Sequence, residues 1–116
     1  MEDYVEMIYR VNKKNIKITE LASLLNIKAS SVSKMIEKLK ELNLVEKEKY
    51  GEINLTQNGK DLGNYLLKRH NLLYKFFNKI NNKDNLYLVE QIEHFFDKET
   101  IDNIESFLTY MEDNNG

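Results

Sequence analysis

The feature that most constrains this sequence is a change of hydrophobic period at Leu44. Before this residue, apolar side chains such as Val32, Ile36 and Leu39 recur at helical spacing. After it, "LVEKEKYGEINLT" contains two runs with strand-like alternation on either side of Gly51. A glycine between two short strands predicts a β-hairpin. The N-terminal half is therefore expected to be a small helical domain that ends in a hairpin.

Helical periodicity accounts for most of the remaining chain. We expect Thr19 to cap the second helix and Ser30 or Ser31 to cap the third, because hydroxyl side chains satisfy free amides at helix N-termini. The segment at 16–18 alternates as a strand does. The expected helices span about residues 2–13, 20–26, 31–43, 58–80, 85–96 and 99–112. The predicted fold class is mainly α, with a helical region following the hairpin.

The composition limits the class of protein. The chain has 116 residues, of which 41% are hydrophobic and 31% charged, a balance typical of a globular protein and not of a disordered tail or a membrane span. No secretory signal is visible at the start, so a cytoplasmic location is expected. The sequence contains no cysteine. Any metal site must then use oxygen and imidazole nitrogen as ligands.

The charge is unevenly distributed along the chain. Residues 1–83 contain 16 Lys and Arg against 10 Asp and Glu, a net charge of +6. Residues 84–116 contain 1 Lys against 9 Asp and Glu, a net charge of −8. This asymmetry suggests an anionic partner for the basic part.

The order helix, helix, helix, hairpin is that of a winged helix-turn-helix, which presents its third helix to the major groove of double-stranded DNA. The third helix is polar and basic on its outer face. Lysines neutralise phosphates, and serine hydroxyls bind phosphate oxygens. A lysine-rich helix face is often only solvated surface, so the prediction depends on the whole arrangement. The expected DNA-binding residues are Lys28, Ser30, Ser31, Ser33, Lys34, Lys38, Lys47 and Lys49.

A second set of polar residues has the chemistry of metal ligands. Two acids lie one turn apart on the first helix, and "EQIEH" would place two more acids and a histidine on one helix face. Each group alone can be ordinary surface. Together they supply four carboxylates and two imidazoles, enough for two ions that share bridging carboxylates. The candidate ligands are Asp3, Glu6, His70, Glu90, Glu93 and His94.

Several segments resemble the diphtheria toxin repressor family of metal-dependent transcription regulators, and in particular its manganese transport regulator branch. The matching motifs are "EDYVEMIY" at 2–9, "RHNLL" at 69–73 and "EQIEH" at 90–94, within a similarity that extends over roughly residues 1–112. The resemblance implies a winged helix-turn-helix DNA-binding domain at 1–60 and a helical metal-binding and dimerisation domain at 61–116.

The resemblance also implies roles for individual residues. Asp3, Glu90, Glu93 and His94 would hold one ion, and Glu6 and His70 would complete a second site by sharing Glu90 and Glu93. Carboxylates in place of sulfur ligands favour Mn(II), with Fe(II) as the alternative. Lys34 would face base edges, with Ser31, Ser33 and Lys38 on phosphates. The implied function is a homodimeric repressor of metal-uptake genes that reads a palindromic operator when metal fixes its geometry.

Three other classes remain open from sequence. A metal-independent winged-helix regulator could answer to a small molecule. A carboxylate-bridged metal enzyme would use similar ligands, but such bundles need paired Glu-x-x-His motifs, and this chain has one Glu-x-x-Glu-His. A protein-interaction module would show no salt-dependent DNA affinity.

Overall fold

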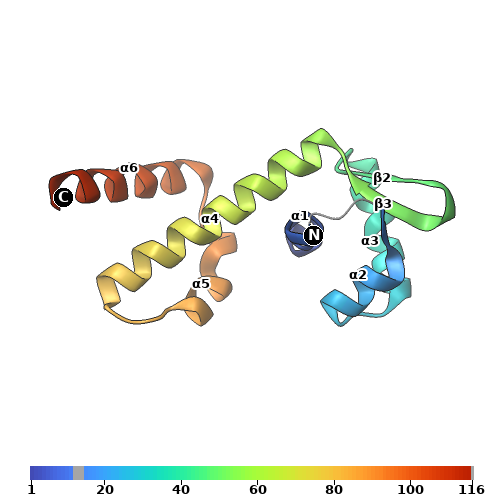
Figure 1. Ribbon diagram of the computed structural model, residues 1–116, viewed down its shortest axis with the longest axis horizontal. Helices are drawn as coiled ribbons and strands as arrows, with labels where there is room; N and C mark the ends of the chain where they lie inside the picture. The colour runs from blue at the N-terminus through green and yellow to red at the C-terminus, as the bar shows by residue number, and fades with distance from the viewer. Residues whose placement is uncertain (12–14, 116) are drawn as a thin grey trace. The chain divides into compact units, whose positions relative to one another are not determined.

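The computed structural model describes residues 1–11 and 15–115 (Figure 1). Its contacts divide the chain into an N-terminal unit, Met1–Leu66, and a C-terminal unit, Leu67–Gly116, each of which is described separately. Helix α4 contributes residues to both units. The elements in chain order are α1 (Glu2–Val11), β1 (Ile16–Lys17), α2 (Ile18–Leu25), α3 (Ala29–Glu41), β2 (Val45–Lys47), η1 (Lys49–Gly51), β3 (Glu52–Leu55), α4 (Gln57–Asn81), α5 (Leu86–Ile92), η2 (Glu93–Phe95) and α6 (Lys98–Asn115).

The predicted fold class is confirmed: the chain is mainly helical, and a small antiparallel sheet follows the third helix. The predicted extension of the first helix to residue 13 lies outside the described residues, because the description of α1 ends at Val11. No helix in the described part of the chain is both long and apolar enough to cross a membrane.

The N-terminal unit is built around one hydrophobic core. Apolar side chains from α1, α2, α3, the sheet and the start of α4 are withdrawn from solvent together. The predicted inner residues of α3 were Val32, Met35, Ile36 and Leu39: Met35 is partly buried against the core, and the other three are 0% exposed. Burying three such side chains fixes which face of α3 points outward.

The sheet has three strands, one more than the predicted two-stranded wing. Its order is β1-β3-β2, and both pairings are antiparallel. The segment that was expected to alternate as a strand supplies β1, in which Ile16 pairs with Ile53 of β3. Both side chains are buried, so the third strand is stabilised by the same core that holds the hairpin.

The hairpin tip agrees with the prediction for Gly51. Residues Lys49–Gly51 form a single 3-10 turn, in which Tyr50 has φ 69° and Gly51 has φ 76°. A left-handed backbone is accessible to glycine without steric cost. This glycine therefore allows the chain to reverse between β2 and β3.

The predicted helix caps were wrong. Helix α2 begins at Ile18, with Lys17 at the N-cap position and Thr19 inside the first turn. Because Lys17 is also the last residue of β1, the helix starts directly where the strand ends, and Glu20 Oε1 accepts a 3.3 Å hydrogen bond from the Lys17 backbone N–H. The chain then turns at Asn26 (φ 55°), whose N–H is bonded to the carbonyls at the end of α2.

Helix α3 likewise starts earlier than predicted. It begins at Ala29 with Lys28 at the N-cap position, which places Ser30 and Ser31 within the first turn instead of before it. The Lys28 carbonyl accepts hydrogen bonds from the backbone N–H groups of Ser31 and Val32. Both serines therefore lie exposed on the N-terminal turn, and neither caps the helix.

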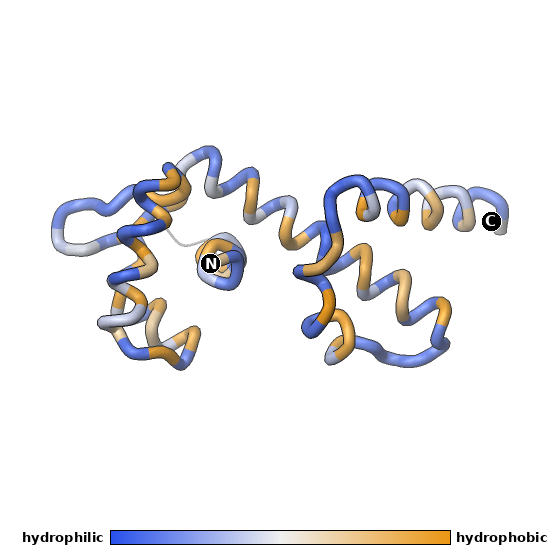
Figure 2. Tube along the Cα trace, turned by 180° about the vertical axis from the view of Figure 1, so that it is seen from behind, coloured by the Kyte–Doolittle hydropathy of each residue, from blue (hydrophilic) through white to orange (hydrophobic). Residues whose placement is uncertain are grey.

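The C-terminal unit packs the second half of α4, α5, η2 and α6 around a separate set of apolar residues. Phenylalanines meet edge to face in three pairs, Phe76 with Phe77, Phe76 with Phe107 and Phe77 with Phe96, with centroids 5.2 to 6.5 Å apart. Figure 2 shows hydrophobic positions recurring along the helices, while the loop between α4 and α5 is hydrophilic. The most buried apolar residues of this unit are Leu73, Val89, Ile101 and Leu108.

One predicted helix in this unit is shorter than expected. The helix predicted at 85–96 ends as an α-helix at Ile92, and Glu93–Phe95 form a 3-10 turn. The final helix, predicted at 99–112, covers Lys98–Asn115. Its N-terminus is capped by Asp97, whose Oδ1 accepts a 2.8 Å hydrogen bond from the Thr100 N–H.

Candidate metal centre and nucleic-acid interface

The outer face of α3 carries the predicted DNA-binding side chains. Lys28, Ser30, Ser31, Lys34 and Lys38 are exposed, and Ser33 is half-buried. No lysine of this face is needed for the core, because the buried side of the helix is apolar. The face is therefore free to meet a polyanion, with its hydroxyls at the N-terminal turn and its positive charges along the helix.

Charged side chains of the β2–β3 hairpin, the wing, lie on both of its faces. Side chains of β2 alternate between the two faces of the hairpin, so Lys47 lies on the face of buried Val45, and Glu46 lies on the opposite one. Lys47 Nζ is 3.4 Å from Glu37 Oε1 of α3, and both groups are exposed. The sequence interpretation counted Lys47 and Lys49 but not this pairing, which offsets part of the positive charge that Lys47 brings to the α3 side.

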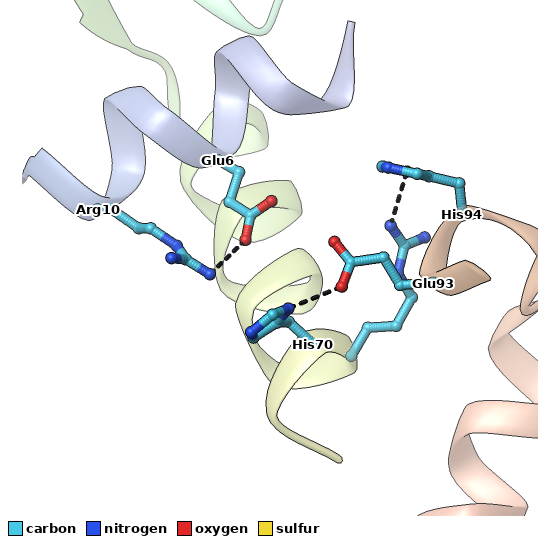
Figure 3. Close-up of polar contacts among 6 residues, drawn as sticks. Glu6, Arg10, His70, Glu93 and His94 are labelled. Carbon is cyan, nitrogen blue, oxygen red and sulfur yellow. Dashed lines mark hydrogen bonds and ion pairs between the residues drawn. The ribbon is translucent and has the colours of Figure 1, made fainter. Parts of the chain in front are cut away.

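The first pair of candidate ligands lies on α1. Asp3 is exposed in the first turn and Glu6 is half-buried one turn later. The Glu6 Oε1 atom accepts a 2.7 Å hydrogen bond from Arg10 Nη2 (Figure 3). The side chain of Glu6 is only 14% exposed, whereas that of Arg10 is 44% exposed. Acids in the first turn also lie at the positive end of the helix dipole.

The C-terminal unit brings two further candidates together. His70 Nδ1, on α4, lies 2.7 Å from Glu93 Oε2, on η2 (Figure 3). Glu93 is 6% exposed, although a carboxylate is costly to bury without compensating partners. The Tyr74 ring lies nearly parallel to that of His70, at an interplanar angle of 8°. Residues 23 positions apart in the sequence thus form a part-buried contact between an imidazole nitrogen and a carboxylate oxygen.

The third contact involves His94, which is exposed on η2. Its Nδ1, at the end of a dashed line in Figure 3, lies 3.4 Å from Arg69 Nη2. Arg69 is only 4% exposed. A guanidinium has no acceptor atom, so the arginine must be the donor and the imidazole nitrogen the acceptor. The sequence interpretation missed both arginine contacts. The spacing of Arg10 four residues after Glu6 was a signal that could have found one of them.

The sequence predicted Glu90, Glu93 and His94 on one continuous helix, but that α-helix ends at Ile92. Glu90 is exposed on α5, while the other two residues belong to the 3-10 turn that follows the end of that helix at Ile92. The expectation of one continuous helix was wrong because the backbone tightens at Glu93. Within residues 1–11 and 15–115, no group of three or more Asp, Glu, His or Cys is gathered closely enough to hold an ion.

The donor set nevertheless fits a divalent transition-metal cation. The contacts of the C-terminal unit present one buried carboxylate with imidazole nitrogens and no sulfur. Carboxylate and imidazole ligands suit Mn(II), Fe(II) and Zn(II). In the neutral form, His70 has one nitrogen for the contact with Glu93 and another for a different partner.

A cavity of about 610 Å³ lies in the N-terminal unit, away from these contacts. Its lining includes none of the six candidate ligands, so it forms no part of the candidate metal centre. It is lined by Ile8, Tyr9, Asn15, Glu46, Asn54, Leu55, Gln57, Lys60, Asp61 and Asn64.

Comparison with known families accounts for almost the whole chain. Residues 1–53 match the iron dependent repressor, N-terminal DNA binding domain. Residues 56–115 match the iron dependent repressor, metal binding and dimerisation domain. The first match includes α3 and β2 and ends within β3, and the second includes α4, η2 and α6.

Individual proteins give the same result. The chain is 38% identical over 117 residues to the HTH-type transcriptional regulator MntR of Oceanobacillus iheyensis, covering 97% of this chain and 80% of that protein. The solved structure of the manganese regulator SloR is similar with a TM-score of 0.77 and 29% identity, covering 94% of this chain and 53% of the other. The structure of ScaR with bound Zn²⁺ is similar with a TM-score of 0.84 and 25% identity, again covering 94% and 53%. This chain thus spans about half the length of those two structures.

Proposed function

The chain belongs to the iron-dependent repressor family, that of the diphtheria toxin repressor, and from this premise we propose that it represses transcription in response to Mn(II), with Fe(II) as the alternative effector. Members of this family are metal-dependent DNA-binding transcription regulators and not enzymes. The observation that carries the choice of site is the buried carboxylate of Glu93 against His70, at 2.7 Å, within the segment that matches the family's metal-binding domain.

We propose six ligands drawn from both units, arranged as two ions per chain. Asp3, Glu90, Glu93 and His94 would hold one ion, and Glu6 and His70 would complete the second by sharing Glu90 and Glu93. A bound divalent cation would supply positive charge that offsets the mutual repulsion of these carboxylates. The preference for Mn(II) follows from four carboxylates and two imidazoles, because oxygen-rich sites without sulfur suit hard cations.

The ligands also suggest how metal binding reaches the DNA. Asp3 and Glu6 belong to the N-terminal unit, which carries α3, and the other four belong to the C-terminal unit. A ligand set shared between the units would couple the position of α3 to the dimerisation domain. A twofold dimer needs its reading helices about 34 Å apart to meet a palindromic operator. A coupling free energy of about 1 to 3 kcal/mol would be enough to change operator occupancy severalfold or more.

The proposal extends to the partners and to the location. The second copy would dock against α5 and η2, where several large apolar side chains are exposed within one short segment. These are Leu86, Tyr87, Leu88 and Phe95, the last of them 85% exposed. We place the protein in the cytoplasm, where its operator would be, and the regulated genes would encode metal uptake. The domain assignment we propose is 1–60 for DNA binding and 61–116 for metal binding and dimerisation.

The test uses duplexes selected from a random-sequence library on the Mn(II)-loaded protein. Glu93→Ala should lose metal-stimulated DNA binding, because it removes a ligand that both ions share. The matched control is Glu99→Ala, which removes an exposed acid in the first turn of α6. Band shifts with Mn(II) and with chelator would be compared for the three proteins. Unchanged stimulation in Glu93→Ala would reject the site, and equal loss in Glu99→Ala would show a general effect of charge.

A further inference from the structure

Both arginines of this chain lie against proposed metal ligands. Of the 17 basic residues, only Arg10 and Arg69 are arginines. Each contacts one of the six proposed ligands: Arg10 Nη2 lies 2.7 Å from Glu6 Oε1, and Arg69 Nη2 lies 3.4 Å from His94 Nδ1 (Figure 3). One contact lies in each structural unit. The two observations are therefore independent of how the units are placed.

Arginine keeps its charge and donates hydrogen bonds from a planar group, but it accepts none. When it donates to His94 Nδ1, the lone pair of that nitrogen is engaged. The neutral ring must then carry its proton on the other nitrogen, Nε2. A metal ion binds only to an unprotonated imidazole nitrogen. In this arrangement neither nitrogen of His94 can coordinate an ion until the arginine contact is broken.

The same reasoning applies to Glu6 in a weaker form. One oxygen of its carboxylate is bound by the Arg10 guanidinium, which also compensates its charge. The other oxygen stays available for coordination. The Arg10 side chain is 44% exposed, whereas Arg69 is 4% exposed. Solvent screens the first contact, so the second should be the harder one for an ion to displace.

We infer that Arg10 and Arg69 are resident counter-cations, which hold Glu6 and His94 in the metal-free chain and which a divalent ion must displace in order to bind. The arginines would then set the metal concentration at which the chain responds. This inference rests on the six-residue site proposed above. This competing role differs from a supporting role, in which the arginines would orient the ligands and strengthen metal binding.

The test replaces each arginine by glutamine, which removes the charge, and by lysine, which keeps it. Mn(II) affinity would be measured by calorimetry and from the electron paramagnetic resonance signal of free Mn(II). If Arg69 holds His94 in about nine of ten metal-free molecules, Arg69→Gln should tighten binding about tenfold. Arg10→Gln should tighten it about threefold, as expected for an exposed pair. Arg69→Lys should stay close to wild type.

The matched control is Lys68→Gln, which neutralises a neighbouring cation on α4 whose partner, Glu105, lies 3.1 Å away and is not a proposed ligand. This variant should bind Mn(II) as the wild type does. Thermal unfolding of each metal-free variant would show that the fold is retained. Should Arg69→Gln fail to fold, Arg10→Gln on the surface of α1 still decides the question.

A second readout needs no metal. Two-bond nitrogen–proton correlations of the His94 ring in the metal-free wild type should show a proton on Nε2 and none on Nδ1. A proton on Nδ1 would overturn the inference, as would glutamine variants that bind Mn(II) no more tightly than wild type. A wild type that binds no Mn(II) would instead remove the proposed metal site itself, so the two failures are distinguishable.

Discussion

Replacing Gly63 by alanine tests how closely α1 and α4 pack within the N-terminal unit. A Cβ atom at Gly63 would lie 2.6 Å from both Cβ and Cγ of Tyr9 and 2.7 Å from its Cδ1. Ordinary carbon contacts are about 3.5 to 4.0 Å, so Tyr9 and its helix would have to move by about 1 Å. The hydroxyl of Tyr9 also donates to Asn64 Oδ1 at 3.3 Å, which restricts the ring.

The expected loss of stability is the overpacking penalty less the gain from the higher helix propensity of alanine. Overpacking of this kind costs about 1 to 3 kcal/mol, and three contacts below 3.0 Å place this site in the upper part of the range. Alanine recovers about 1 kcal/mol over glycine in a helix. Gly63→Ala should therefore lower the free energy of unfolding by about 1 to 2 kcal/mol. For a domain of this size the melting temperature falls by about 4 to 8 °C for each kcal/mol.

The assay is thermal unfolding followed by circular dichroism, with Mn(II) titrations beside it. Because α1 also carries Asp3 and Glu6, its displacement should weaken Mn(II) binding. Gly51→Ala is the matched control: nothing lies within 4 Å of its added Cβ, but φ is +76°, so it should cost stability through the backbone and leave Mn(II) binding unchanged. A Gly63→Ala protein as stable as wild type would refute the reasoning.

A double mutant adds a check on the cause. Tyr9→Ala removes Cγ and Cδ1, two of the three crowded atoms, while the Cβ contact stays. The combined variant should therefore lose less stability than the sum of the two single variants. Simple additivity would show that the tyrosine is not what opposes the alanine.

Three further predictions concern the surface and the final helix. Lys34→Ala should weaken operator binding and leave Mn(II) affinity near that of the wild type. If this lysine contacts a phosphate, the slope of log affinity against log salt concentration should fall in magnitude by about 1. If it reads a base edge, the slope should stay unchanged. Tyr87→Glu, a change at a residue 77% exposed on α5, should shift the protein to monomer in sedimentation velocity, and an unchanged dimer would place the interface elsewhere. Hydrogen bonds from the Thr100 side chain and backbone lower the pKa of Asp97 below its ordinary 3.8. The ionised carboxylate therefore stabilises the fold above pH 3.8, and this contribution is lost as the pH falls through the lowered pKa. Asp97→Asn should flatten this acid dependence of the melting temperature.

Local patterns were sufficient for the elements that local interactions decide. The helical spacing of Val32, Ile36 and Leu39 predicted the inner face of α3, and Gly51 predicted the hairpin turn; both predictions are confirmed. Each depends on residues within one helix or one hairpin. Hydrophobic periodicity and turn-forming residues are local signals, which can be read from a single sequence.

Non-local contacts explain the failures. The alternation at 16–18 indicated a strand, but not its pairing with the hairpin: Ile16 pairs with Ile53 across 36 intervening residues, beyond the reach of any local pattern. The early start of α2 follows from that strand, since Lys17 ends one element and begins the next. The helix break at Glu93 has no proline or glycine to announce it. It lies where Glu93 meets His70 of α4, 23 positions earlier.

The charge distribution along the sequence also differs from the charge distribution between the two structural units. The boundary at residue 83 used for the sequence does not coincide with the structural one at Leu66. Residues 1–66 contain 11 Lys and Arg against 10 Asp and Glu, a net charge of only +1, and residues 67–116 contain 6 against 9, a net charge of −3. The lysines of the second half of α4 belong with the acidic residues, as the pairs Lys68 with Glu105 and Lys75 with Glu112 show.

Attraction to DNA must therefore come from local charge and not from the net charge of the domain. Lys34 and Lys38 are exposed one turn apart on one face of α3, and Glu37 of the same helix is paired with Lys47 of the wing. At physiological ionic strength charges act over about 8 Å, which is shorter than the domain. A local cluster can then bind phosphates although the whole unit is almost neutral. It follows that Glu37→Gln, which removes the opposing acid, should strengthen DNA binding at low salt more than at high salt, and equal affinity at both would place the contact surface away from this face.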